Sequence, residues 1–380
     1  MVCCCITEKF QLIYGRSPAW AARAPGRIEF IGNHTDYNGG PVIGAAINRY
    51  VSVAIAPRAD GVWNFYSDFT GHLATLPAHC ISRQEGELSW LNYPLGVLDA
   101  FPAFGFKRPE GFDLLTMSDL PAGSGLSSSA ALELATALAF LSLTGQSIER
   151  ARLVQLARHA ENQFVGVPCG ILDQGVSAFG KVNHLVWIDC LLQTFATVPL
   201  PADVHFWIFN THTKHALIDG MYAERHHECM QAAHALDVPL LVHATPAQVE
   251  AARPGLSASQ FKRARHVVEE IARVEQCIDA LRGGDLVTTG RLLTASHRSS
   301  QCLFENSTTE LDFLVDQLTR NPSVYGARLS GGGFGGSVMA LTQSSFKESD
   351  ALRIQQSYEV QFDVEPEGFH LLTANGAAPI

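Results

Sequence analysis

The sequence has no cluster of lysine and arginine residues, and its 380 residues carry a net formal charge of −10. Nucleic acids are bound through a basic surface that neutralises their phosphates, so we expect no nucleic-acid partner. A nucleotide substrate is not excluded, because a few backbone amides and one metal ion can hold its phosphate groups. The charge therefore argues against one class of partner and leaves nucleotide chemistry open.

Long hydrophobic runs and targeting signals are also missing. A membrane-spanning helix needs about 18 or more apolar residues in succession. The longest candidate, Ala130 to Leu143, is interrupted by Glu133 and is typical of a buried core helix. The N-terminus, MVCCCITEKF, lacks the basic segment and apolar core of a secretory signal. We therefore expect no membrane partner.

A disulfide framework is absent as well, since the nine cysteines are an odd number without regular spacing. Free thiols are typical of a reducing compartment, so we predict a cytoplasmic location. The run Cys3–Cys5 leaves a lipidation or metal site open. The simpler interpretation is that this run belongs to a mobile tail without function, and we assign residues 1–19 to an N-terminal tail.

What the sequence does contain is an alternation of strand-like and helix-like segments in a chain that is 47% apolar. The patterns predict strands at residues 43–56, 112–117, 205–209, 337–341 and 369–373, and helices at 130–143, 148–164 and over most of 222–281. Two prolines within Val198–Ala202 indicate a boundary. We predict an α+β fold with an N-terminal lobe, residues 20–199, and a C-terminal lobe, residues 200–380.

The most informative local pattern is the segment Leu120–Ala131, which follows a strand candidate and leads into a long apolar helix. Gly123 and Gly125 permit backbone conformations that direct successive N–H groups to one point. The serines after them lie at a helix N-terminus, where unpaired amides attract phosphate and a hydroxyl can ligate Mg²⁺. An ordinary capped turn is the alternative, but three serines before an apolar helix favour phosphate.

Two other glycine patterns do not predict a nucleotide site. Gly331–Gly336 satisfies G-x-G-x-x-G, but a strand-like run follows it where the dinucleotide fingerprint requires a helix. Gly175–Lys181 approaches a Walker A loop, but Val182 stands where Ser or Thr would bind metal. The glycines at 331–336 still permit close approach of the backbone to a ligand or a neighbouring loop.

Two further segments are rich in polar side chains. Ala24–Gly40 offers a guanidinium, an amide, an imidazole and a carboxylate, a mixture that suits sugar hydroxyls, which both donate and accept. A polar turn between strands is the alternative. Glu161–Gln174 presents Asp173 among apolar neighbours, where a carboxylate is either functional or part of a structural ion pair.

In this order, these segments resemble the galactokinases of the GHMP kinase superfamily. Ala24–Gly40 is similar to the galactokinase signature, Leu120–Ala131 to the phosphate-binding motif, and residues 327–341 (ARLSGGGFGGSVMAL) to the third family motif. The resemblance runs from about Phe10 to Thr373 and implies a two-lobed GHMP-kinase-like fold with the active site between the lobes.

Two shorter matches lie between these motifs. Trp90–Tyr93 with Gly96 is similar to the adenine-side segment of the family, and His215 with Tyr222 and Arg225 is similar to a sugar-side segment. Each motif alone is weak, and the five together are very specific.

The resemblance implies an ATP-dependent sugar 1-kinase, with galactose as the favoured substrate, ATP as co-substrate and Mg²⁺ as cofactor. Asp173 would act on the C1 hydroxyl as general base or orienting group, with Arg27 stabilising the developing charge, and Ser129 and Glu161 would hold Mg²⁺. The implied nucleotide ligands are Trp90 at the adenine, and Gly123, Ser124, Gly125, Leu126, Ser127 and Ser128 at the phosphates. The implied sugar ligands are Asn33, His34, Asp36, Gly170 and Tyr222. Phosphoryl transfer depends on positioning and charge stabilisation, which such a division supplies.

The chain departs from the family pattern inside the signature. The family usually has Glu where this chain has Asn33, Asn where it has Glu29, and Pro-Met-Ala where it has residues 44–46. The Glu position of the family contacts the sugar toward its C6 end. We therefore hypothesise that Asn33 relaxes or redirects recognition there, since an amide both donates and accepts.

Three alternatives follow. Another sugar 1-kinase would act on galacturonate, an N-acetylhexosamine or a pentose. A catalytically silent sugar and ATP sensor is disfavoured, because sensors tend to carry a damaged phosphate loop and this loop is intact. A metal-binding protein using His212, His215, His226, His227 and Cys229 is weaker still, because this spacing matches no closed zinc site.

Overall fold

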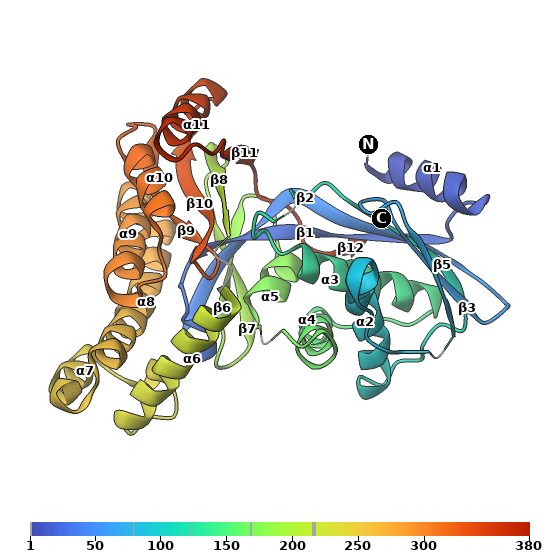
Figure 1. The fold of residues 1–380 in the computed structure, drawn as a ribbon, viewed down its shortest axis with the longest axis horizontal. Helices are drawn as coiled ribbons and strands as arrows, with labels where there is room; N and C mark the ends of the chain where they lie inside the picture. The colour runs from blue at the N-terminus through green and yellow to red at the C-terminus, as the bar shows by residue number, and fades with distance from the viewer. Residues whose placement is uncertain (1, 79, 122, 168, 215–217) are drawn as a thin grey trace.

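The computed structural model describes residues 2–78, 80–121, 123–167, 169–214 and 218–380, which form two β-sheets with helices packed on them (Figure 1). Within these ranges eight strands form the first sheet: β1 (Trp20–Ile31), β2 (Pro41–Pro57), β3 (Val62–Ser67), β4 (Leu73–Pro77), β5 (Phe112–Ser118), β6 (His184–Asp189), β7 (Thr194–Pro199) and β12 (Ala378–Pro379). Strands β12-β1-β2-β5-β3-β4 are neighbours in this order, and β6 joins β2 to β7. Only the pairing of β3 with β5 is parallel in this sheet.

The long strand β2 connects the two halves of the molecule. Successive side chains of a strand point to opposite faces, and those of β2 enter different cores. Val42 and Ala46 pack in one core with the helices of the first sheet, whereas Ile43 and Ile47 pack in another with residues of the second sheet. This alternation places the end of β1 and the loop after it between the two sheets.

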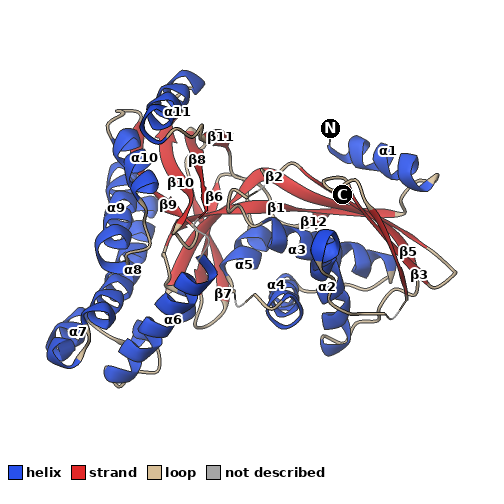
Figure 2. Ribbon diagram, in the orientation of Figure 1, coloured by secondary structure: helices blue, strands red, loops and turns tan. Residues whose placement is uncertain are grey.

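Helices α2 (Asn92–Ala103), α3 (Ser128–Leu143), α4 (Arg150–His159) and α5 (Leu172–Phe179) cover one face of the first sheet (Figure 2). The central helix α3 is buried nearly all round, which its alanine- and leucine-rich sequence permits. Helix α1 (Val2–Tyr14) packs on the sheet at β2 and β5.

The second sheet is antiparallel, in the order β11-β8-β10-β9, and consists of β8 (Val204–Lys214), β9 (Val324–Ser330), β10 (Gly335–Gln343) and β11 (Glu367–Leu371). The helices of this half are α6 (Ile218–Ala235), α7 (Pro246–Ala252), α8 (Ala258–Arg282), α9 (Leu286–Ser299), α10 (Thr309–Thr319) and α11 (Glu348–Phe362). Helices α9 and α10 pack on β9.

The predicted strands and helices are found, with two differences. The predicted helix 148–164 is α4 followed by a π-helical turn, Ala160–Val165. The N-terminal tail assigned to residues 1–19 includes a packed helix, α1, which the sequence analysis did not predict. Ile6 and Phe10 of α1, four residues apart and so on one helix face, are fully buried against Leu115 and neighbouring residues.

The chain passes from the first sheet to the second between β7 and β8, and β12 returns to the first sheet beside β1. The lobe bounds 20–199 and 200–380 stay a prediction. Within the described ranges, none of the helices is long and apolar enough to cross a membrane.

Candidate active site

Asp173 and Arg27, 146 residues apart, form an ion pair where α5 meets β1. Arg27 Nε donates to Asp173 Oδ1 at 2.8 Å, and Arg27 Nη2 lies 2.7 Å from the same oxygen. Arg27 Nη1 also donates to the Gly125 carbonyl at 2.6 Å. The arginine side chain is 8% exposed and the aspartate 25%, so the carboxylate is the more accessible member of the pair.

The glycine- and serine-rich loop lies directly against this ion pair. The Ser127 hydroxyl donates to the other Asp173 oxygen, and the Arg27 backbone N–H donates to the Leu126 carbonyl at 3.0 Å. Gly123 and Gly125 both have positive φ, at 69° and 70°, which their lack of a side chain permits. The loop that leads into α3 therefore lies beside Asp173 of α5, and its role in binding phosphate stays a prediction.

Two other loop residues, Ser124 and Leu126, point inward and fix the segment. Ser124 is buried: its hydroxyl donates to the Pro121 carbonyl at 2.8 Å, and its own carbonyl accepts from Ser337 of β10 at 2.9 Å. Leu126 is buried in the core between the sheets. Ser128 is exposed at the first position of α3.

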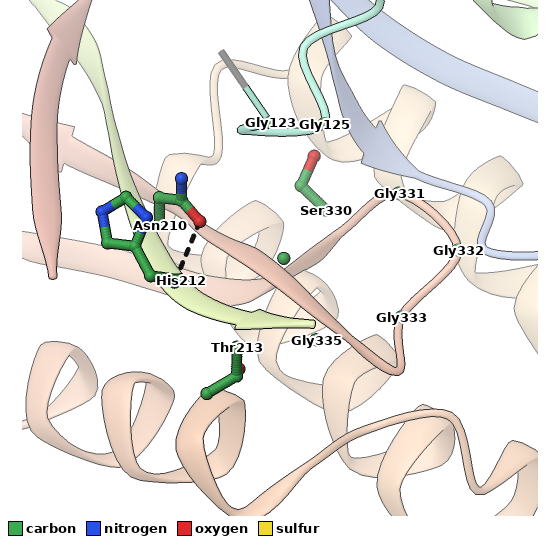
Figure 3. Close-up of a pocket in the computed structure, with 11 residues that line it drawn as sticks. Gly123, Gly125, Asn210, His212, Thr213, Ser330, Gly331, Gly332, Gly333 and Gly335 are labelled. Atoms are coloured by element: carbon green, nitrogen blue, oxygen red, sulfur yellow. Dashed lines mark hydrogen bonds between the residues drawn. The ribbon is translucent and has the colours of Figure 1, made fainter. Parts of the chain in front are cut away.

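A pocket of about 320 Å³ separates this loop from the second sheet (Figure 3). Its walls include Gly123 and Gly125, the residues Asn210, His212 and Thr213 at the end of β8, and glycines at the connection of β9 and β10. The glycine-rich connection is tight, since a Cβ on Gly333 would lie 2.2 Å from the Asn306 carbonyl oxygen, in the loop before α10. The prediction that residues 331–336 permit close approach to a neighbouring loop is therefore confirmed.

The signature residues after β1 gather around Asp36. A Cβ on Gly170 would lie 1.8 Å from Asp36 Oδ2, so only glycine fits there. The Tyr222 ring lies 5.1 Å from that of His34, between centroids. Burial, together with the charges of Glu29 and Asp173, raises the pKa of Asp36 to about 6. Burial first, and then the charges of Asp36, Asp173 and Glu29, raise the pKa of Tyr222.

His34 is buried with both ring nitrogens engaged. Nδ1 lies 2.9 Å from the Tyr37 hydroxyl and Nε2 lies 3.0 Å from the Gly332 carbonyl, while the ring stacks on Phe304. Burial lowers the pKa of His34 to about 3. The neutral imidazole therefore joins the signature loop to the second half of the molecule.

The Asn33 side chain is buried and makes four hydrogen bonds. Nδ2 donates to Glu29 Oε1 at 3.1 Å and to the Gly331 carbonyl at 2.8 Å. Oδ1 accepts from the Ser300 hydroxyl at 3.2 Å and from the Asn306 amide at 2.8 Å. A primary amide has two N–H donors and two lone pairs, so all of its capacity is used within the protein.

Glu29 is held in turn by Arg328 of β9. Arg328 Nη2 donates to Glu29 Oε1 at 3.1 Å, and the arginine is fully buried. The backbone N–H groups of Gly32 and Asn33 donate to Glu270 of α8 at 3.1 and 3.2 Å. Burial alone would raise the pKa of Glu270, but the charges of Arg273 and His266 hold it at about 2. Sequence inspection missed Arg328 and Glu270.

Ser129 and Glu161, the predicted metal ligands, are in contact. The Glu161 carboxylate accepts a hydrogen bond from Ser129 and another from Gln174 Nε2 at 2.5 Å. Gln174 Nε2 also donates to Glu133 Oε2 at 3.2 Å. Burial raises the pKa of Glu161, and the Asp173 charge raises it further; burial also raises the pKa of Glu133.

These groups suit Mg²⁺, although no three His, Cys, Asp or Glu side chains converge as a metal site in the ranges that the structure describes. Mg²⁺ is usually held by one or two carboxylates together with substrate phosphates. Glu133 Oε1 and Gln174 Oε1 are buried without a partner among the described residues. A bound cation would balance the charge of the two buried carboxylates, Glu133 and Glu161. Glu133 was visible in the sequence as the one acidic residue within an apolar helix, four positions after Ser129.

The remaining predictions are placed as follows. Trp90 lies half-buried in a 3₁₀ turn, Gly86–Leu91, and its indole N–H has no partner among the described residues. His215 lies outside the described residues. His212, His226, His227 and Cys229 form no metal-binding group in the described part of the chain.

Comparison with known proteins agrees with this geometry. Three family models match: the galactokinase galactose-binding signature at residues 8–57, the GHMP kinases N terminal domain at 92–181, and the GHMP kinases C terminal domain at 277–359. Human galactokinase is 38% identical over 356 residues, which cover 92% of this chain and 90% of that protein. The galactokinase of Roseiflexus sp. is 38% identical over 358 residues, covering 93% and 91%.

Solved structures show the same relation. Lactococcus lactis galactokinase complexed with galactose matches with a TM-score of 0.94 and 32% identity over the whole of both chains. A mevalonate kinase, with a TM-score of 0.66 and 17% identity, shares the fold. The predicted two-lobed α+β fold is confirmed, and the chain belongs to the galactokinase family of GHMP kinases.

Proposed function

We propose that this protein is a galactokinase, which transfers the γ-phosphoryl group of ATP to the C1 hydroxyl of galactose to give galactose 1-phosphate and ADP. The observation that carries the proposal is the junction of Asp173, Arg27 and the loop at Gly125 and Ser127. It brings a carboxylate, a guanidinium and a phosphate-binding backbone to one point. In-line phosphoryl transfer depends on such positioning and charge stabilisation.

Asp173 is the group that acts on the sugar. Its partly exposed carboxylate orients the C1 hydroxyl and takes its proton as the bond from O1 to the γ-phosphorus forms and the bond from that phosphorus to the bridging oxygen of ADP breaks. Arg27 compensates the aspartate charge and lies beside the forming bond, where charge develops. The proton leaves to solvent after the product departs.

The nucleotide is held by the backbone of residues 123–128 with Ser128 at the start of α3, and Trp90 lies against the adenine. Ser129 and Glu161 hold Mg²⁺, which neutralises phosphate charge when bound. Asp36, Tyr222 and the close turn at Gly170 line the sugar. The sequence-based prediction of a cytoplasmic location is part of this proposal.

The test is sugar-dependent ADP release by the purified protein with ATP, Mg²⁺ and galactose, with ³¹P NMR to identify an anomeric phosphate. Asp173→Asn should lower kcat by about 10²–10⁴-fold while calorimetry finds ADP binding unchanged. The matched control is Asp237→Asn, at an exposed left-handed position after α6 that asparagine tolerates. Wild-type protein that binds ATP but releases no ADP with galactose would contradict the proposal.

A further inference from the structure

We propose that Glu29, and not Asn33, is the side chain of the signature that selects a sugar hydroxyl at the C4–C6 end of the ring, with Asn33 holding Glu29 in place. This inference rests on the proposed galactokinase activity and names one of its specificity determinants. It reverses the hypothesis that the sequence suggested for Asn33.

The first argument is that every hydrogen-bonding group of the Asn33 side chain is already used within the protein. Its two N–H groups reach Glu29 and Gly331, and its oxygen accepts from Ser300 and Asn306. The side chain is 1% exposed. A sugar hydroxyl could contact this amide only by displacing one of four existing hydrogen bonds, so Asn33 acts as a positioning residue.

The second argument is that the Glu29 carboxylate can still accept a hydrogen bond from a ligand. Asn33 and Arg328 both donate to Oε1, and in the described part of the chain no hydrogen bond is made to Oε2. A carboxylate offers about four acceptor sites. The buried Arg328 compensates the charge of Glu29, so the glutamate can remain a charged acceptor in a site from which water is largely excluded.

The third argument is the position of Glu29 relative to Arg27 on β1. Arg27 and Glu29 lie two residues apart on β1, and their pairing with Ala46 and Gly44 of β2 is regular between them. Their side chains therefore project from the same face, about 6–7 Å apart along the strand. With Arg27 beside the C1 oxygen, Glu29 faces the far side of a pyranose ring.

Glu29 is also close to the other residues around the sugar. Its charge is among those that raise the pKa of Asp36 and of Tyr222. Asp36 in turn contacts the turn at Gly170, which leads into Asp173. The four side chains of Glu29, Asp36, Tyr222 and Asp173 thus surround one region, with Asp173 at the C1 end.

The experiment compares kcat/KM for galactose, 2-deoxygalactose, 4-deoxygalactose and 6-deoxygalactose in wild type and in Glu29→Gln. We expect wild type to disfavour either the 4-deoxy or the 6-deoxy sugar by about 10–100-fold, because a charged acceptor would lose its donor. In Glu29→Gln the ratio of kcat/KM for galactose to kcat/KM for that deoxy sugar should fall to a few-fold. The corresponding ratio for 2-deoxygalactose should stay the same.

Glu29→Gln leaves Arg328 without a counter-charge and is checked for folding by thermal stabilisation with ADP. Glu29→Asp is the second variant: it keeps the charge beside Arg328 but withdraws the second oxygen, and the same ratio should fall. Unchanged 4-deoxy and 6-deoxy ratios in the folded variants, or a change in the 2-deoxy ratio alone, would overturn the inference. Wild type without activity on galactose would instead contradict the proposed function.

Discussion

Two buried polar clusters flank Asp173, and they differ in how their charge is balanced. The signature cluster consists of Glu29, Asn33, Asn306 and Arg328, and the α3 cluster of Glu133, Glu161 and Gln174. In the signature cluster a buried arginine faces the glutamate at 3.1 Å. In the α3 cluster one amide bridges two carboxylates, and among the described residues no Lys or Arg forms an ion pair with either.

The unpaired atoms follow the same difference. Arg328 Nε and Asn306 Oδ1 lack partners among the described residues, but the charges of the signature cluster cancel. In the α3 cluster the unpaired atoms are oxygens, Glu133 Oε1 and Gln174 Oε1. Buried charge is tolerated when it is paired. The charge of the signature cluster is therefore balanced within the chain. The charge of the α3 cluster is balanced only when protons or a cation are bound.

The largest expected effect tests whether the signature cluster depends on its own cation. Arg328→Met removes the cation and leaves Glu29 buried, which should cost about 3–5 kcal/mol of stability. Glu133→Gln removes an uncompensated acid of nearly the same shape from the α3 cluster and should be neutral or stabilising by about 1 kcal/mol. Urea midpoints of the ligand-free proteins measure both. Equal losses in the two variants would abolish the distinction between the clusters.

The second prediction sharpens the assignment of the α3 cluster to a metal. Glu161→Gln should weaken divalent cation binding in the presence of ADP by about 10–100-fold, because it removes a carboxylate that would ligate the metal. EPR of Mn²⁺ measures this cation affinity without requiring turnover. Glu149→Gln is the matched control, since Glu149 is an exposed cap of α4. A Mn²⁺ affinity unchanged by Glu161→Gln would remove Glu161 from the metal site.

The clusters also mark where sequence interpretation succeeded and where it could not. Strands β2, β5, β8, β10 and β11, helix α3 and the glycine- and serine-rich loop follow from local periodicity and from glycines and serines at a helix start. The pairing of Glu29 with Arg328 joins residues 299 positions apart, which no local pattern contains. Asn33 was assigned to the sugar because the Glu at its position in the family contacts the sugar. The structure uses that amide fully within the protein.

Helix α1 was missed for a different reason. Its sequence signal, Ile6 and Phe10 four residues apart, was present, but the neighbouring cysteine run suggested a tail. Glu133 was noticed only as an interruption of an apolar run. Its meaning depends on Gln174 and Glu161, which the fold brings to it from two other elements.

The third prediction concerns the coupling between Glu29 and Asn33. Asn33→Glu places a second carboxylate beside Glu29 and should destabilise the protein by about 1–3 kcal/mol. Combining it with Glu29→Asn restores one carboxylate and one amide facing Arg328, and should recover most of that loss. A double-mutant cycle on urea midpoints measures the coupling. Additive losses would mean that the two side chains do not act as a pair.

The smallest expected effect is a pH dependence of sugar binding at Asp36, which lies beside the signature cluster. Burial, with the charges of Glu29 and Asp173, raises the pKa of Asp36 to about 6. Hydroxyls that donate to the carboxylate favour its ionised form, so sugar affinity is complete above this pKa and is lost as the pH falls through it.

From about pH 7 to about pH 5, KM for galactose should therefore rise about tenfold, since one proton must leave for each sugar bound. The KM for ATP, measured in the same samples, is the internal control and should change far less, because Asp36 lies with the signature residues and not on the phosphate loop. Asp36→Asn should bind galactose about as weakly at pH 7 as wild type does at low pH, and should lose the pH dependence. A wild-type KM that is constant over this range would mean that the Asp36 carboxylate does not accept a hydrogen bond from the sugar.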